Sequence, residues 1–238
     1  MKHDSIVQAF NNASKAINEL EEVIREQHNT PHENIDRTVY NKIQVPHDYI
    51  RTRWYFVREY KLDYLLESKA HRDNIAYALM QSDMYNYIVN RFQIWGIIEK
   101  LFLKTALINI VAIQEALIIC SLKTLHSHCI IGGSVCKYNS KCSGYVKSVK
   151  SLHYTSCISL FESKIGFGND DRMNEIIELK DIRNNVHISL IGKGEFHSDN
   201  YTIANYNKAI RNLHYLKSHL RIQIDAFKIS RGQVCTAK

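Results

Sequence analysis

One segment, residues 101–120, limits what this chain can fold into more than any other. It reads LFLKTALINIVAIQEALIIC, which is long and apolar enough for a transmembrane helix. It also holds Lys104 and Glu115, and a charged residue at the middle of a bilayer costs about 3 kcal/mol. At 100° per residue its polar side chains form one narrow stripe, made of Lys100, Lys104, Gln114 and Glu115. This pattern predicts the central helix of a bundle with one edge in water, and we expect no membrane span.

The composition favours an all-α fold. The chain has 238 residues, enough to bury a core without disulfides or metals. Only 9 Gly and 2 Pro are present, which is few for a β-rich protein with many tight turns. We therefore predict an up-and-down helical bundle with an extra N-terminal helix.

Two regions are expected. Residues 1–45 hold a helix over 5–27 and a connection, and residues 46–234 hold the bundle, with an exposed loop rich in Cys and Gly at 127–150. Apolar residues of the N-terminal helix alternate at spacings of three and four, which predicts packing on the bundle or on a partner. They are Ile6, Phe10, Ala13, Ile17, Leu20 and Ile24.

Within the bundle, periodicity predicts helices over 48–70, 150–165, 170–190 and 201–229. Pro46 is expected near the start of the first. Ser82 is expected to be the N-cap of a further helix that continues through Gly96 into the central one. The helical period also predicts one core-facing stripe in each of the last two helices. In 170–190 the stripe residues are Met173, Ile176, Leu179, Ile182, Val186 and Leu190, and in 201–229 they are Ile203, Tyr206, Ile210, Leu213, Leu216, Leu220, Ile224 and Phe227.

The formal charge of +7 and a pI near 9.0 favour contact with a polyanion, and RNA is the expected partner. Arginines alternate with aromatic residues between 48 and 70, as in surfaces that pair phosphates and stack bases. The RNA-binding candidates there are Arg51, Arg53 and Arg58. The alternative is an amphipathic helix with its aromatic side chains in the core and its arginines in water.

The opening MKHDSIVQAF has no apolar run typical of a secretory signal, so we expect a cytoplasmic protein with reduced cysteines. The residues that could bind structural zinc are His126, His128, Cys129, Cys136 and Cys142. The gaps between the cysteines do not match known zinc modules, and thiols in a loop are the alternative. We expect no cofactor.

The common nucleotide, zinc-protease and hydrolase signatures are absent, and the chemically informative run is IELKDIRNNVHISL at 177–190. Arg183 and His187 are four positions apart, so they lie on one helix face at the edge of the core. Histidine can move a proton at neutral pH and arginine can bind a phosphate in bidentate fashion. Together they suit cleavage of a phosphodiester by a neighbouring 2′-hydroxyl. The alternative is that Arg183 pairs with a nearby carboxylate, such as that of Glu178 or Asp181, and that His187 covers a packing edge.

The run Leu179–His187, with Asn184 after the arginine, resembles the signature helix of the HEPN superfamily (higher eukaryotes and prokaryotes nucleotide-binding). The resemblance covers about residues 83–230, because an apolar helix with an acid, Glu115, precedes a variable loop, the motif helix and a long final helix. It implies a metal-independent endoribonuclease that dimerises with its motif helices face to face. Arg183 and His187 would be catalytic, and Asn184 would position them. Three residues separate Arg183 from His187 here, where the family signature has four to six.

The resemblance also implies a role. Many HEPN proteins are toxins or phage-defence effectors, often beside a nucleotidyltransferase-like antitoxin partner. Lys180, on the same helix as Arg183, is a further candidate for RNA binding. Other members of the superfamily have lost catalysis, so a non-catalytic module that binds nucleic acid or protein is the second hypothesis.

Overall fold

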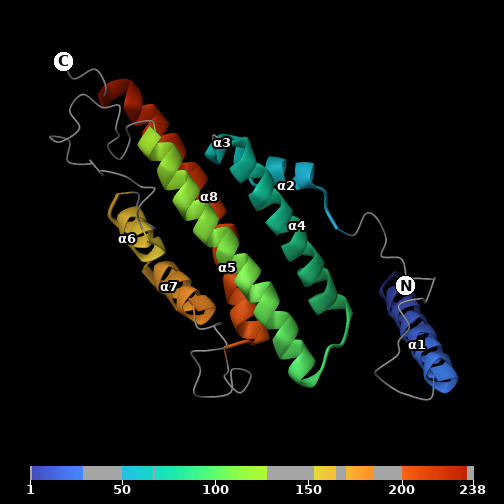
Figure 1. Ribbon diagram of the computed structural model, residues 1–238. Coiled ribbons are helices and arrows are strands. Elements are labelled where there is room, and N and C mark those ends of the chain that lie inside the picture. Colours follow the sequence, from blue (N-terminus) through green and yellow to red (C-terminus); the bar gives the residue numbers. More distant parts are fainter. Residues whose placement is uncertain are drawn as a thin grey trace. The chain divides into compact units, whose positions relative to one another are not determined.

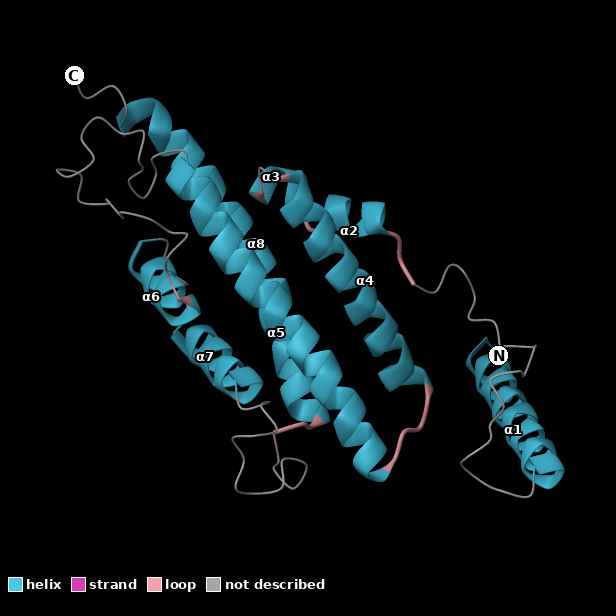
Figure 2. Ribbon diagram, viewed as in Figure 1, coloured by secondary structure: helices cyan, strands magenta, loops and turns pink. Residues whose placement is uncertain are grey.

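A computed structural model describes residues 2–28, 50–66, 68–127, 153–164, 170–184 and 200–234 (Figures 1 and 2). All regular structure in these ranges is helical, which confirms the predicted all-α class. The chain divides into two compact units, residues 1–47 and 48–238.

The first unit contains α1, Lys2–His28, which is the helix predicted over residues 5–27. Asp4 lies in its first turn, where a carboxylate interacts favourably with the helix dipole. Within the predicted apolar seam Ile17 is partly buried, and Ile6 and Leu20 are exposed. Packing of this helix on the bundle or on a partner stays a prediction.

The second unit is a helical bundle. Its helices are α2 (Arg53–Glu59), α3 (Leu62–Leu65), α4 (Lys69–Arg91), α5 (Gly96–Ser127), α6 (Tyr154–Lys164), α7 (Asp170–Asn184) and α8 (Ile203–Val234). The helix α5 contacts α4, α6, α7 and α8. In Figure 1, α5 and α8 run side by side, with α2, α3 and α4 on one side and α6 and α7 on the other. The apolar segment therefore forms the central helix, as predicted.

The core is built around α5, whose apolar side chains are buried on several faces. They include Leu103, Leu107, Ile110, Ile113, Leu117, Ile118 and Leu122. The predicted polar stripe is wrong at Gln114, which is fully buried and whose Nε2 donates to the Ala209 carbonyl of α8 at 2.9 Å. Residues Gly96–Lys123 are long and apolar enough to cross a membrane, but 61% of their most apolar window is buried inside the protein, as in a core helix.

The predicted helix over 48–70 is broken into two. Thr52 caps α2, accepting a hydrogen bond from the Tyr55 N–H at 3.3 Å. Lys61 then takes a left-handed conformation, with φ of 51°, which ends the first helix and opens the short α3. Ser68 begins α4 by accepting from the His71 N–H at 3.4 Å. The aromatic pattern continues on both sides of Lys61, so the sequence pattern could not reveal this break.

Two further predictions about helix ends are wrong. Ser82 is not an N-cap, because it is buried in the middle of α4. The chain also does not continue as one helix into α5, since α4 ends at Arg91 and residues 92–95 form a connection. Gly96 follows with φ of 66°, a conformation that side chains with a Cβ rarely adopt.

Among the stripe residues whose side chains the structure describes, α7 and α8 bury most. Met173, Ile176 and Leu179 of α7 are buried. In α8 the buried residues are Tyr206, Leu213, Leu216 and Leu220, whereas Ile203 is exposed, against the prediction. Pro46, Val186, Leu190 and residues 128–150 of the predicted loop lie outside the described residues.

Candidate active site

The last turn of α7 carries the arginine of the predicted pair. Arg183 and Asn184 are the final residues of this helix, and Arg183 Nη1 donates to Asn184 Oδ1 at 3.3 Å. Arg183 is partly buried, which agrees with its predicted place at the edge of the core. His187 lies outside the described residues.

Arg183 forms an ion pair with an acid from another helix. Its Nη2 lies 3.4 Å from Oε2 of Glu115 in α5. The acids on its own helix have other partners, since Asp181 pairs with Lys180 and Glu178 pairs with Lys208. Arg183 therefore pairs with a nearby carboxylate, as the alternative interpretation expects, but that carboxylate belongs to Glu115 and not to Glu178 or Asp181.

Tyr154, the first residue of α6, lies beside this ion pair. Its hydroxyl is buried and makes no hydrogen bond in the described ranges. Burial raises the pKa of Tyr154, Glu115 raises it further, and Arg183 opposes the shift. A buried hydroxyl without a partner costs free energy, so a polar group reaching it would be stabilised.

A second contact between α6 and α7 joins Lys180 to Thr155. Lys180 Nζ lies 3.3 Å from Oγ1 of Thr155, and its side chain is buried apart from this polar end. In α6, burial raises the pKa of the Cys157 thiol, against the opposing charge of Lys123. The predicted RNA contact Lys180 thus joins two helices of the bundle.

Sequence reasoning found Arg183, Asn184 and Glu115 but missed Tyr154. The tyrosine belongs to the run LHYTSC, which has no recognisable motif. Tyr154 comes to the site because α6 and the motif helix α7 both pack against α5, and no local pattern encodes that packing.

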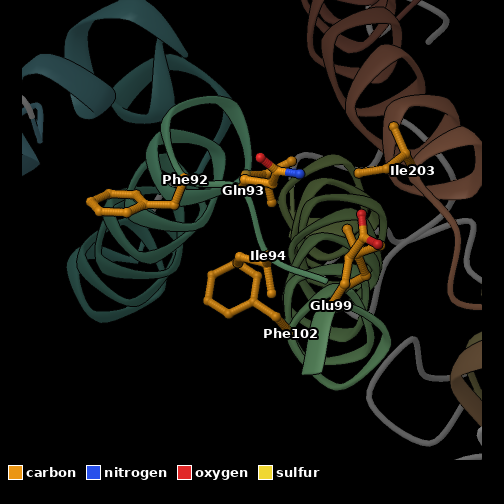
Figure 3. A pocket seen from close by; sticks show the side chains of 8 residues that line it. Phe92, Gln93, Ile94, Glu99, Phe102 and Ile203 are labelled. Atoms are coloured by element: carbon orange, nitrogen blue, oxygen red, sulfur yellow. The ribbon is translucent and has the colours of Figure 1, made fainter. Parts of the chain in front are cut away.

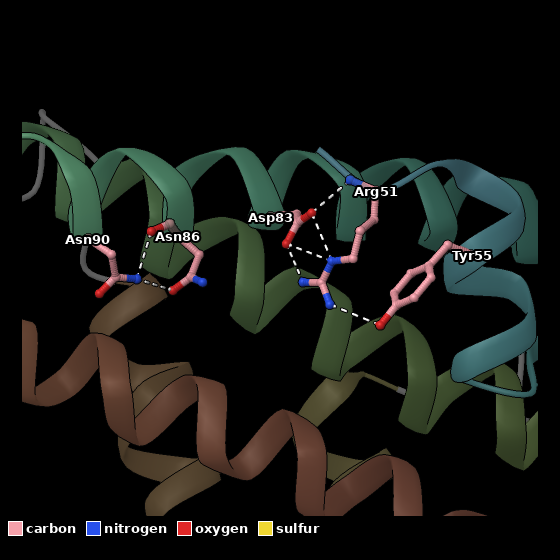
Figure 4. A network of polar contacts seen from close by, with 5 residues as sticks. All are labelled: Arg51, Tyr55, Asp83, Asn86 and Asn90. Atoms are coloured by element: carbon pink, nitrogen blue, oxygen red, sulfur yellow. Dashed lines mark hydrogen bonds and ion pairs between the residues drawn. The ribbon is translucent and has the colours of Figure 1, made fainter. Parts of the chain in front are cut away.

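The other candidate arginines lie around α2. Arg51 faces the buried Asp83 of α4: its backbone N–H donates to Oδ2 at 2.9 Å and its Nε at 3.0 Å (Figure 4). Its Nη1 donates to the Tyr55 hydroxyl at 3.1 Å. The hydrogen bond to Asp83 raises the pKa of Arg51. Most donors of this guanidinium are therefore used within the protein.

Arg53 and Arg58 differ in their surroundings. Arg53 forms an ion pair with Asp73 of α4, and its guanidinium lies 4.0 Å from the centre of the Trp54 ring. Arg58 is exposed, and its Nε is 3.6 Å from Oε1 of the neighbouring Glu59. Such exposed pairs contribute little to stability, so among the predicted RNA contacts Arg58 is the one most open to a ligand.

A separate pocket of about 190 Å³ lies where α4 passes into α5 (Figure 3). Apolar side chains such as Phe92, Ile94, Phe102 and Ile203 line most of it, and Glu99 is its charged residue. With one carboxylate and no histidine or cation in its lining, this pocket is a poor place for phosphodiester chemistry.

The zinc candidates are not tested. His126 lies in the last turn of α5, but the structure describes nothing of its side chain, and His128, Cys129, Cys136 and Cys142 lie outside the described residues. Among the residues that are described, no three His, Cys, Asp or Glu side chains gather as metal ligands would.

The ion pair of Glu115 and Arg183, beside Tyr154, is thus the candidate active site. No family model, curated protein or solved structure matches this chain.

Proposed function

We propose that this protein is a metal-independent endoribonuclease of HEPN type, with Arg183 and His187 as its catalytic residues. The observation that carries the proposal is the ion pair between Glu115 and Arg183 at a partly exposed edge of the bundle. A guanidinium has five N–H groups, and the contacts to Glu115 and Asn184 engage Nη2 and Nη1. The remaining donors can bind a phosphate, and Glu115 fixes the direction in which they point.

The reaction needs one proton taken and one given. In the proposed mechanism a ribose 2′-hydroxyl loses its proton to a base and its oxygen forms a bond to the neighbouring phosphorus. The bond from phosphorus to the 5′-oxygen breaks, and that oxygen receives a proton. His187 is proposed as the base or the acid, and Arg183 as the group that stabilises the charge on the phosphate. The products are a 2′,3′-cyclic phosphate and a 5′-hydroxyl.

One observation favours the second candidate, a non-catalytic module that binds nucleic acid or protein. The carboxylate of Glu115 already balances part of the charge of Arg183, which weakens the pull of that guanidinium on a transition state. In either case the protein is proposed to act in the cytoplasm as a homodimer, and as a toxin or phage-defence effector with a nucleotidyltransferase-like antitoxin partner.

The test compares purified wild type with His187→Ala and Arg183→Lys on total RNA, with EDTA present. Proton transfer contributes roughly 10² to 10⁴ in rate, so His187→Ala should abolish detectable cleavage. Arg183→Lys should also fail, because an ammonium cannot reproduce the planar fork of a guanidinium. The matched controls are His71→Ala in α4 and Arg211→Lys in α8, which belong to other helices than Glu115, Tyr154 and Arg183 and should cleave like wild type.

Equal degradation by wild type and His187→Ala would contradict the proposed reaction, as would products that end in a free 3′-hydroxyl. If wild type binds RNA but does not cleave it, the second candidate, a non-catalytic binding module, is the correct one.

A further inference from the structure

Two hollows meet at Lys61, in the turn between α2 and α3. One has a volume of about 290 Å³ and is lined by Trp54, Arg58, Lys61 and Asp63. The other has a volume of about 400 Å³, lies between this turn and α8, and is lined by Glu59, Tyr60, Lys61, Lys217, Ser218 and Arg221. Lys61 lines both, and we call the two together the corner groove.

The corner groove has an excess of positive charge. Its cations are Arg58, Lys61, Lys217 and Arg221. Its two carboxylates already have partners: Glu59 lies 3.6 Å from Arg58, and Asp63 lies 3.1 Å from Nε of Arg72. Over the described ranges no ion pair holds Lys61, Lys217 or Arg221. These three charges are available to an anionic ligand.

Aromatic rings accompany the cations. Lys217 Nζ lies 4.6 Å from the centre of the Tyr60 ring, which orients the ammonium without neutralising it. Trp54 is 69% exposed although the Arg53 guanidinium lies over its ring. Most of the indole surface is therefore open to a planar group.

The backbone at Lys61 supports a ligand site. Its φ of 51° is left-handed, a conformation that costs free energy for any residue with a Cβ. Strain of this kind concentrates where a side chain must be aimed for function. Here it places the one cation that lines both hollows.

We propose that the corner groove binds single-stranded RNA, with phosphates on Lys61, Lys217 and Arg221 and one base on Trp54. A cationic groove with an exposed aromatic ring is the arrangement by which proteins hold single strands, because an unpaired base can stack on the ring. A duplex keeps its bases stacked and cannot use it. The inference rests on the proposed function for the identity of RNA as substrate, but binding can be measured without cleavage.

The groove draws on one of the three arginines that the sequence suggested, Arg58. Arg51 and Arg53 are used by Asp83 and Asp73, whereas Lys217 and Arg221 come from α8, far along the chain. In Figure 1 the helices α2 and α3 lie across α5 and α8 from α6 and α7, so groove variants leave the residues around Arg183 in place.

The first experiment measures binding of a fluorescent single-stranded RNA to His187→Ala protein, with EDTA present, as a function of salt. Three phosphate contacts predict a slope of log K against log salt of about −2, at about 0.7 per contact. The triple variant Lys61→Gln, Lys217→Gln, Arg221→Gln should bind weakly, with the slope reduced by about 2. The control Arg211→Gln removes an exposed cation of α8 outside the groove and should bind like the parent.

The second experiment uses the two tryptophans of the chain, which are similarly exposed, at 69% for Trp54 and 73% for Trp95. With Trp95→Phe, Trp54 is the sole reporter and its fluorescence should be quenched by the RNA. With Trp54→Phe, Trp95 should report no change. Trp54→Ala should weaken binding by about 5- to 100-fold, the effect of losing one stacked base, and Trp95→Ala should not.

Equal affinity of the triple variant and Arg211→Gln would overturn the inference, as would binding of duplex RNA as tight as that of the single strand. The two proposals fail separately. If wild type does not cleave but the groove variants lose binding, only the proposed reaction is wrong. If His187→Ala abolishes cleavage but the triple variant binds and cleaves like wild type, only the groove is wrong.

Discussion

Glu115 and Arg183 join the central helix to the last turn of α7, with 3.4 Å between Glu115 Oε2 and Arg183 Nη2. The Glu115 side chain is 23% exposed, so water screens this pair less than it screens the pair of Lys208 and Glu178, whose carboxylate is 62% exposed. The two pairs hold the same helix to different neighbours, which makes them a natural comparison.

We predict that Glu115→Gln lowers the free energy of unfolding by about 1–2 kcal/mol, because it leaves Arg183 without its partner at a partly buried position. Glu178→Gln should cost less than about 0.5 kcal/mol, as exposed pairs do. Denaturant unfolding of the two variants checks this. Equal losses would mean that burial does not distinguish the pairs.

Leu117 of α5 is fully buried, and we predict that Leu117→Ala costs about 2–5 kcal/mol through lost burial and the cavity left behind. At about 2–4 °C for each kcal/mol, the melting temperature should fall by at least about 4 °C. Ile98→Ala, on an exposed part of the same helix, should change it little. A large effect of Ile98→Ala would show that this surface is covered in solution.

The stability should depend on pH through His214 of α8. Burial, together with Lys217 and Arg51, lowers the pKa of His214 from its ordinary value of 6.5. Below pH 6.5 the unfolded chain therefore binds a proton that the folded protein does not, and stability falls as the pH falls toward the lowered pKa. The His214→Gln variant should lose this part of the pH dependence. Unfolding free energies of both proteins between pH 5 and 8 give the difference, and parallel curves would contradict the shift.

Deleting residues 1–29 should lower the melting temperature or the solubility. The seam of Ile6, Phe10, Ile17, Leu20 and Ile24 would otherwise expose contiguous apolar surface, which is rare in monomers unless it serves binding. Thermal melts and solubility of the truncated and full chains test this. If neither changes, the segment does not pack.

We predict a homodimer, because the resemblance to the HEPN superfamily implies that two motif helices lie face to face. Sedimentation at roughly tens of micromolar protein, the range of transient association, checks this. A monomer under these conditions would rule out a catalytic site built from two motif helices.

The sequence predicted the fold class because the signals for it are local. Residues 101–120 are apolar on nearly every side, and only a helix surrounded by other helices can bury them. The stripes of α7 and α8 follow from the helical period in the same way. Helix ends were predicted less well: Lys61 turns left-handed without a glycine or proline to signal it, and Ser82 resembles a cap but packs inside α4.

The candidate site was predictable only where its residues belong to one helix. Arg183 and Asn184 were found because a single turn holds both, and Glu115 because it is an acid in an apolar run. Tyr154 belongs to another helix than Arg183, and Asp83 belongs to another helix than the segment of its partner Arg51. Two positions far apart in the sequence show no local pattern that would link them. Contacts of this kind depend on how helices pack, which one sequence does not encode locally.

The turn between α4 and α5 places an unusual demand on Gly96. Apart from its chain neighbours and its own helix backbone, no atom of the described residues lies within 4 Å of where a Cβ would stand, so there is space for a side chain, yet the φ of 66° disfavours residues that have one. Gly96 is therefore required by its backbone conformation, which an L-amino acid with a Cβ rarely adopts, and not by a lack of space for a side chain. Filling the open space with a side chain would therefore leave the backbone strain in place, and glycine is the residue that avoids this strain.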